Sequence, residues 1–128
     1  MVRRNTRAVG AAAEQVACDF LNDRGLKTVA RNFRCRLGEI DLIMRHRDYL
    51  VFVEVRFRAG RRIATAGVTV DHHKQRKLIR TAALFLARQT RLANSTVRFD
   101  VVAIDVDQSG QRTIEWIRDA FRPGDASL

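Results

Sequence analysis

Acidic side chains interrupt two apolar segments of this chain, and their types and spacing could hold a metal ion. Glu39 and Asp41 lie two residues apart, and Glu54 follows in a segment that is otherwise aliphatic or aromatic around a short polar turn. An ionised carboxylate is costly in such a setting unless a partner compensates for its charge. Because like charges this close repel each other, we expect a hard cation to bind between them through carboxylate oxygens. The alternative is that the acids are solvated and paired with arginines on an open face of a sheet.

The turn between the two segments decides whether the acids share one face. Side chains alternate between the faces of a strand, so Glu39 and Asp41 share a face, and so do Glu54 and Arg56. A two-residue turn at 47–48 or a four-residue turn at 45–48 would bring all four side chains together, whereas a three- or five-residue loop would separate them. We prefer the even-length turn because the opposite face is then uniformly apolar. That face would carry Ile40, Leu42, Met44, Val51, Val53 and Val55.

A helix is predicted before these strands, because apolar residues recur at helical spacing from residue 9 to residue 21. Gly25 is a suitable residue to end it. On a helical wheel Glu14 lies about 20° from Leu21, at the border of the buried face, so its carboxylate could reach the sheet. An ordinary boundary glutamate explains this position equally well.

Strands are predicted at 27–34, 38–45 and 49–58, which form a meander, and again at 97–106 and 113–117. The strand at 97–106 is nearly continuous in apolar residues and is expected inside the sheet. Asp100 interrupts it and, with Glu115, could be a further acid of the site. We expect Asp100 instead to be a buried aspartate bonded to a neighbouring arginine or a backbone amide.

A second helix is predicted from the N-cap Asp71 to about Arg88. Its buried face would carry Leu78, Ile79, Ala82, Phe85 and Leu86. Gln75 lies on the same face in the first turn, which suggests that this helix end directs its amides and Gln75 toward a ligand. Capping and solvation explain the same residues without a ligand.

The charge of the chain points to a polyanionic partner. There are 24 basic and 14 acidic residues, a net charge of +10, and such an excess favours nucleic acid through phosphate contacts. A GC-rich genome would explain the preference for arginine over lysine but not the net charge. We expect phosphate contacts from a loop at 59–67 and from the second helix, although a solvated loop without a ligand is the alternative. The residues concerned are Arg58, Arg61, Arg62, Lys74, Arg76, Lys77 and Arg80.

Length and cysteine content indicate a single cytoplasmic domain. A chain of 128 residues can bury one sizeable core, with a flexible arm expected at 1–8 and a flexible tail at 119–128. Cys18 and Cys35 have neither CxxC nor zinc spacing, and two cysteines do not make a disulfide framework, so a reducing cytoplasm fits. The sequence has no transmembrane segment, and we expect no membrane partner.

Several motifs together resemble the YraN family of small bacterial proteins. That family is assigned to the PD-(D/E)xK nuclease superfamily, with similarity to archaeal Holliday-junction resolvases and to the tRNA-endonuclease-like fold. The resemblance implies an α/β fold with a restriction-endonuclease-like αβββαβ core, in which helices flank a mixed sheet of about five strands. The motifs are Gly10-x-x-x-Glu14, Arg31-Asn32-Phe33-Arg34, Gly38-Glu39-Ile40-Asp41-Leu42-Ile43, Val51-Phe52-Val53-Glu54-Val55-Arg56-x-Arg58, Lys74-Gln75-x-Lys77-Leu78 and Arg98-Phe99-Asp100-Val101-Val102.

The resemblance also implies a metal site. The metal-binding aspartate of the superfamily matches Asp41, its (D/E)xK element matches Glu54-Val55-Arg56, and the helix acid of resolvase-like members matches Glu14. A Mg²⁺ or Mn²⁺ ion would then be held by Asp41, Glu54 and the Val55 carbonyl. The outer or second-metal ligands would be Glu14 and Glu39.

Arg56 stands where the superfamily has a lysine. Its guanidinium, with a pKa above about 12, cannot act as a base, but it can stabilise the charge that develops on a reacting phosphate. The whole pattern predicts an endonuclease with DNA favoured over RNA, and branched or junction DNA as one substrate it could cut. Junction cleavage would call for a symmetric homodimer. The predicted catalytic residues are Asp41, Glu54, Arg56, Glu14 and Gln75.

Two further hypotheses belong to other classes of protein. One is a catalytically silent nucleic-acid-binding module of the same fold, which Arg56 favours. The other is an adaptor for an acidic protein partner. Three mutually repelling acids favour the enzyme, because a silent module has no need of them.

Overall fold

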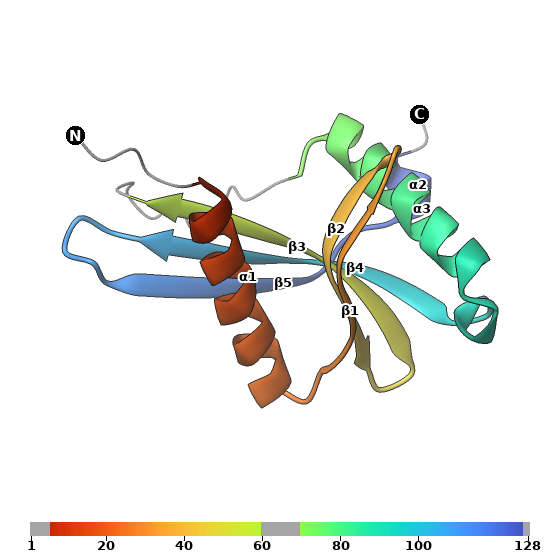
Figure 1. Ribbon diagram of the computed structural model, residues 1–128, viewed down its shortest axis with the longest axis horizontal. Coiled ribbons are helices and arrows are strands. Elements are labelled where there is room, and N and C mark those ends of the chain that lie inside the picture. Colours follow the sequence, from red (N-terminus) through yellow and green to blue (C-terminus); the bar gives the residue numbers. More distant parts are fainter. Residues whose placement is uncertain (1–5, 60–69, 127–128) are drawn as a thin grey trace.

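The computed structural model describes residues 6–59 and 70–126. Five strands form one mixed sheet in chain order, with β1 and β5 at its edges (Figure 1). β3 and β4 are parallel, and the other neighbouring pairs are antiparallel. The elements are α1 (Thr6–Asp23), β1 (Lys27–Cys35), β2 (Gly38–His46), β3 (Tyr49–Ala59), α2 (His72–Arg88), a 3-10 turn (Thr90–Leu92), β4 (Thr96–Val106), β5 (Arg112–Phe121) and α3 (Pro123–Ala126).

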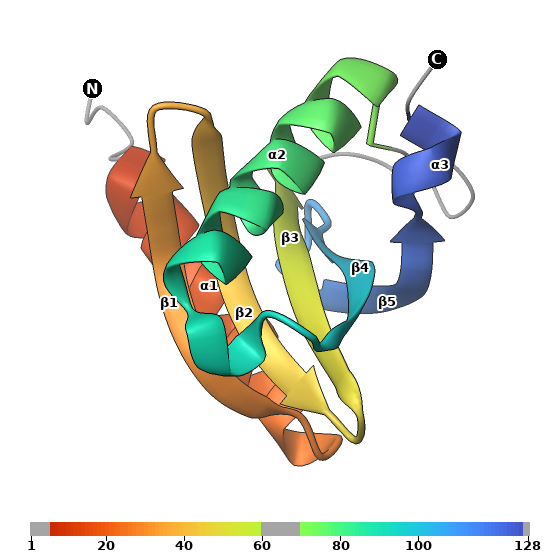
Figure 2. The same ribbon diagram turned by 90° about the vertical axis from the view of Figure 1, so that its right-hand side faces the viewer.

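The predicted α/β fold with an αβββαβ core is confirmed. The two long helices lie on opposite faces of the sheet, and Figure 2 shows α2 in front of it and α1 behind it. The crossover through α2 makes β4 parallel to β3 and places it inside the sheet. Among the described residues, no helix combines the length and apolar character that crossing a bilayer requires.

α1 ends at the glycine that the sequence suggested. Gly25 has a φ of 94°, a left-handed conformation that glycine adopts without steric cost. The Leu26 N–H donates to the Leu21 carbonyl at 3.1 Å and the Gly25 N–H to the Asn22 carbonyl at 3.1 Å, which is the Schellman arrangement. Leu21 and Leu26 are both buried in the cluster beneath α1, so the cap also returns the chain to the sheet.

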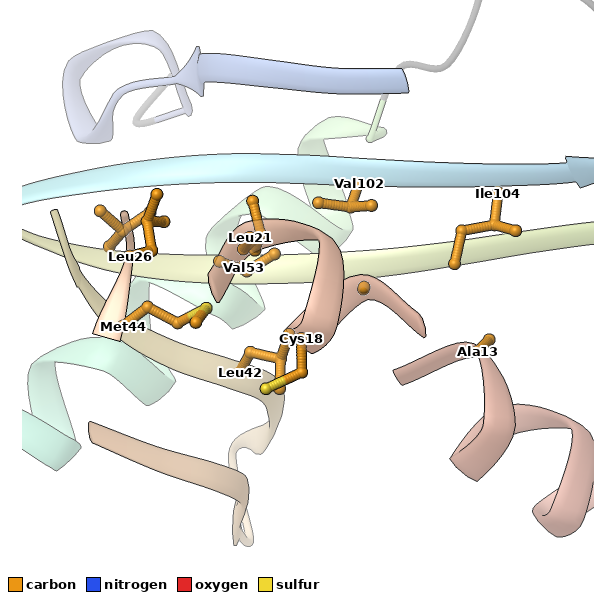
Figure 3. Packing of buried hydrophobic residues seen from close by; sticks show 11 residues of the cluster. Ala13, Cys18, Leu21, Leu26, Leu42, Met44, Val53, Val102 and Ile104 are labelled. Carbon is orange, nitrogen blue, oxygen red and sulfur yellow. The ribbon is translucent and has the colours of Figure 1, made fainter. Parts of the chain in front are cut away.

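Alternation along the strands supplies each helix with its own apolar layer. Val51 and Val53 face α1, whereas Leu50 and Phe52 face α2. Figure 3 draws the layer beneath α1, where Cys18 and Leu21 of the helix lie over Leu42 and Val53 of the sheet. The layer beneath α2 includes Leu78, Ala82 and Phe85, on the helix face that the sequence predicted.

Ile40 departs from the predicted alternation. It is buried with Ile43 in the layer beneath α2, whereas Leu42 and Met44 belong to the layer beneath α1. The prediction that Ile40 shares the apolar face with Leu42 is therefore wrong. Ile40 stays paired with Phe33 of β1, but the alternation is broken between Leu42 and Ile40. There the pairing of β2 with β3 has ended, and Asn32 of β1, between the partners of Leu42 and Ile40, has a φ of 52°.

Asp100 is a structural residue, as expected. It is fully buried and accepts hydrogen bonds from Arg98 Nε and from the Asp119 and Trp116 N–H groups, each at 2.9 Å. Asp119 belongs to β5, which continues through residue 119, where the flexible tail was predicted to begin, to the buried Phe121. Of the predicted arm, residues 1–5 lie outside the described part of the chain.

Candidate metal centre

The candidate site lies where β2 and β3 separate. Arg47 and Asp48 form a two-residue turn, because His46 pairs with Tyr49. At the other end, the pairing of β2 with β3 stops at Leu42 opposite Val53. The predicted even-length turn is thus confirmed. Just beyond the last pair, Asp41 Oδ2 accepts a hydrogen bond from the Val55 N–H at 2.8 Å. The Asp41 carboxylate therefore accepts the hydrogen bond of the Val55 N–H at the point where backbone pairing of β2 with β3 ends.

Three predicted acids converge here from different elements. Glu14 comes from α1, and Glu39 and Asp41 come from β2. One carboxylate oxygen of each lies within 4.8 Å of an oxygen of the other two. The border position of Glu14 on its helix, inferred from the helical wheel, is what lets it reach across to the strand.

Glu54 completes the group. Burial raises the pKa of Asp41 to about 8, the neighbouring Glu54 carboxylate adds to this rise, Glu14 contributes less, and the hydrogen bond from Val55 opposes it. The raised pKa of Asp41 thus follows from its burial beside two other carboxylates. Such a set is stable either with a proton on Asp41 or with a cation among the carboxylates.

Two cations within the chain already pair with the acids. Lys74 Nζ lies 2.5 Å from Glu54 Oε2, and Arg34 Nε lies 2.8 Å from Glu39 Oε2. The Glu39 pair is exposed on both sides, whereas the Glu54 side chain is only 7% exposed. Arg34 was missed by the sequence analysis, although its signal was present: the hairpin of β1 with β2 places it directly opposite Glu39.

A cavity of about 620 Å³ opens over these acids. It lies between the β1–β2 hairpin and the first turns of α2, and it joins three of the four acids to basic side chains. Its lining residues are Arg34, Cys35, Gly38, Glu39, Asp41, Glu54, Val55, Asp71, His73, Lys74, Lys77 and Leu78.

Arg56 and Gln75, both predicted to be catalytic, are not among the described residues that line this cavity. The Arg56 side chain is half-buried, its Nε has no hydrogen-bond partner among the described residues, and its charge helps to lower the pKa of Asp71 after the larger effect of the Lys74 N–H. Gln75 Nε2 donates to the Val70 carbonyl at 2.6 Å, and its buried Oε1 has no partner in the described part of the chain.

The predicted phosphate contacts are distributed unevenly. Lys74 and Lys77 line the cavity, while Arg76 and Arg80 lie elsewhere on α2. Arg58 is occupied by Asp105, with 3.0 Å between its Nε and Oδ1. The predicted contacts of Arg61 and Arg62 lie outside the described residues.

Comparison with known proteins places the chain among close relatives. Residues 13–104 match a family described as "Uncharacterised protein family UPF0102". A UPF0102 protein of Nitrosococcus oceani is 47% identical over 116 residues, which cover 91% of this chain and 93% of that protein. Another, from Pseudomonas putida strain W619, is 40% identical over 121 residues, covering 94% of this chain and 98% of the relative. A third, from Methylococcus capsulatus, is 45% identical over 112 residues, covering 88% and 89% respectively.

Proposed function

The chain belongs to the UPF0102 family, the YraN family that its motifs resemble, and we propose that it is an endonuclease that hydrolyses DNA with a divalent cation. One observation carries the proposal: carboxylate oxygens of Glu14, Glu39 and Asp41 lie within 4.8 Å of one another, beside a buried Glu54 that raises the pKa of Asp41. Acids in this arrangement repel each other unless protons or cations neutralise them.

The donor set suits Mg²⁺ or Mn²⁺, because all four side chains offer hard carboxylate oxygens. Asp41 has one oxygen bonded to the Val55 N–H, which orients the carboxylate, and the Asp41 carboxyl is also within hydrogen-bond reach of Glu54. In the proposal Asp41, Glu54 and the Val55 carbonyl are the ligands, and Glu14 and Glu39 are outer or second-metal ligands. A bound divalent cation supplies Lewis-acid activation of the phosphate and a lowered pKa for the attacking water.

The surroundings favour a phosphodiester as substrate. Arg34 and Lys77 line the cavity together with the acids, and the chain has a net charge of +10, which favours a polyanion. In the reaction a water oxygen bonds to phosphorus and the bond to the leaving oxygen breaks. One water proton ends on the leaving alcohol, and the products are an alcohol and a phosphate monoester.

A silent nucleic-acid-binding module is the second candidate. Arg56 favours it, because it stands in place of the superfamily lysine and is not among the described residues lining the cavity. The two functions differ in what they require of the acids. An enzyme needs Glu54 and Asp41, whereas a module that grips phosphates should bind at least as well when these negative charges are removed.

The test is a cleavage screen over single-stranded, duplex, flap and four-way-junction DNA, with RNA counterparts, in Mn²⁺ and in Mg²⁺. Glu54→Gln is the inactivating variant. Glu115→Gln is the matched control, since Glu115 is an exposed glutamate on β5 and is not among the described residues that line the cavity. Binding of the same substrates is measured in parallel by fluorescence anisotropy in Ca²⁺.

We expect cleavage by the wild type and by Glu115→Gln, and a loss on the order of 10²-fold or more in Glu54→Gln. Absence of cleavage on every substrate with either metal, with DNA binding unimpaired in Glu54→Gln, would refute the enzyme and support the module.

A further inference from the structure

Both the main chain and the side-chain tip of Lys74 are held in place at the candidate site. It is the third residue of α2, and its backbone N–H donates to the N-cap carboxylate of Asp71 at 2.8 Å. Its side chain spans to β3, where Nζ lies 2.5 Å from Glu54 Oε2. A residue anchored at its main chain by a cap and at its tip by a buried acid has little freedom to point elsewhere.

The position is unfavourable for a lysine unless something offsets it. The first turn of a helix carries partial positive charge and repels cations, and α2 has no acid in that turn. The Glu54 carboxylate offsets this cost, and the Lys74 side chain stays 46% exposed toward the cavity. The ammonium thus contacts a proposed metal ligand, and it remains accessible to a phosphate bound in the cavity.

Arg56 does not offer this geometry. It lies two residues after Glu54, so alternation places it on the same face, yet it is not among the described residues lining the cavity. Its Nε is buried without a partner among the described residues. The charge that meets Glu54 inside the cavity comes from α2.

We propose that Lys74, in place of Arg56, is the catalytic cation of this site: its ammonium releases Glu54 when a divalent cation binds and then donates hydrogen bonds to the scissile phosphate and the attacking water. This inference rests on the proposed nuclease function. In this role the ammonium stabilises charge through hydrogen bonds and takes no proton from water. In the metal-free protein the same ammonium neutralises Glu54, and it therefore competes with the metal.

Two measurements on one set of variants test the proposal. The set is Lys74→Met, Lys74→Arg, Arg56→Met and, as the matched control, Lys27→Met, which removes an exposed lysine at the start of β1. Mn²⁺ binding is measured by calorimetry at pH 8 without DNA. Single-turnover cleavage is measured at saturating protein on the substrate that the wild type cuts best.

Lys74→Met should bind Mn²⁺ about threefold or more tightly, because no ammonium competes for Glu54, and should cleave on the order of 10²-fold more slowly. Lys74→Arg should restore cleavage to within about tenfold of wild type, because it restores the cation. Arg56→Met should stay within about tenfold of wild type, and Lys27→Met should match it in both measurements. A merely structural Lys74 would instead weaken Mn²⁺ binding when removed.

The outcomes separate the two proposals. If the wild type cleaves and Lys74→Met cleaves equally well, or if Arg56→Met loses the activity that Lys74→Met retains, the inference about Lys74 fails while the nuclease stands. If the wild type cuts nothing and binds no Mn²⁺, the proposed function and this inference fail together. If it binds Mn²⁺ but cuts nothing, the nuclease and the catalytic role of Lys74 both fail, and the Mn²⁺ affinity of Lys74→Met then shows only whether the ammonium competes with the metal for Glu54.

Discussion

Asp41 should make the stability of the metal-free protein fall as pH rises. Its carboxyl has an ordinary pKa of 3.8 and a pKa of about 8 in the folded protein, because burial and then Glu54 disfavour its charge. Between these two values the folded state holds a proton that the unfolded state has released. The free energy of unfolding therefore decreases as pH rises through this window, and the contribution of Asp41 levels off above it.

The magnitude follows from the width of the window. One group costs about 1.4 kcal/mol per pH unit, so Asp41 alone should lower the free energy of unfolding by about 3–4 kcal/mol between pH 5 and pH 8. The residue is only 9% exposed, so solvent screens little of this effect. His46 acts in the opposite direction, because burial and then Arg98 lower its pKa from 6.5, so its contribution rises as pH increases toward that value.

The perturbation is Asp41→Asn, which removes the charge and keeps an oxygen that can accept the Val55 N–H. At pH 7.5 with a chelator, this variant should be more stable than wild type by about 3 kcal/mol or more, and the decline above pH 6.5 should disappear. Urea unfolding at pH values from 5 to 8.5 measures both. The matched control is Asp105→Asn: Asp105 is also buried on a strand but pairs with Arg58 at 3.0 Å, so its neutralisation should cost about 1–3 kcal/mol.

Adding Mn²⁺ should close most of the gap between wild type and Asp41→Asn. At a free Mn²⁺ concentration of 100 times Kd the wild type gains about 2.7 kcal/mol, whereas Asp41→Asn, which lacks the central ligand, should gain nothing. The reasoning is refuted if wild-type stability with chelator is constant between pH 6.5 and pH 8, or if Asp41→Asn is the less stable protein under those conditions.

Three other predictions concern the metal, the nucleic acid and the cavity wall. Mn²⁺ affinity of the wild type should rise about tenfold per pH unit up to about pH 8 and then level off, because Asp41 must release its proton; calorimetry at constant ionic strength checks this, and a flat profile contradicts it. DNA affinity should fall by about 10³-fold or more between 50 and 200 mM salt if six or more phosphates are contacted; anisotropy that is insensitive to salt would mean that the basic surface is not the binding surface. Gly38→Ala should cost about 1–3 kcal/mol, because a Cβ there would lie 2.9 Å from Thr81 Oγ1. Thermal unfolding of the double variant with Thr81→Ala should show smaller loss than the two single changes added together, and simple additivity would rule out the clash.

Much of this arrangement is encoded locally. The N-cap Asp71 and the stop at Gly25 set helix ends through hydrogen bonds to residues within one turn, and such signals are visible in a sequence. The two-residue turn between His46 and Tyr49 fixed which residues of β2 and β3 face each other. The proximity of Asp41 to Glu54 follows from that parity, whereas Glu39 lies beyond the last β2–β3 pair, where the alternation is broken.

What the sequence could not predict depends on how elements dock. The contact of Lys74 with Glu54 requires α2 to lie at one particular height on the sheet, and no local pattern sets that height. The face of the sheet on which Ile40 lies depends on where the pairing of β2 with β3 ends. The prediction from alternation assumed that this pairing continues along the whole strand. The pairing of Arg34 with Glu39, by contrast, needed only the same parity argument applied to the first hairpin.

Side chains from both faces of the sheet come together where β2 and β3 separate, beyond Leu42. α1 and α2 pack on opposite sides of the sheet with separate sets of buried side chains. Glu14 from α1 nevertheless lies beside Glu39 and Asp41, and Lys74 from α2 pairs with Glu54, the neighbour of Asp41. A ligand bound among these acids would therefore link α1 and α2, which pack on opposite faces of the sheet. Local unfolding of either helix would then require the ligand to dissociate. Amide protons in both α1 and α2 should therefore exchange more slowly once Mn²⁺ is added.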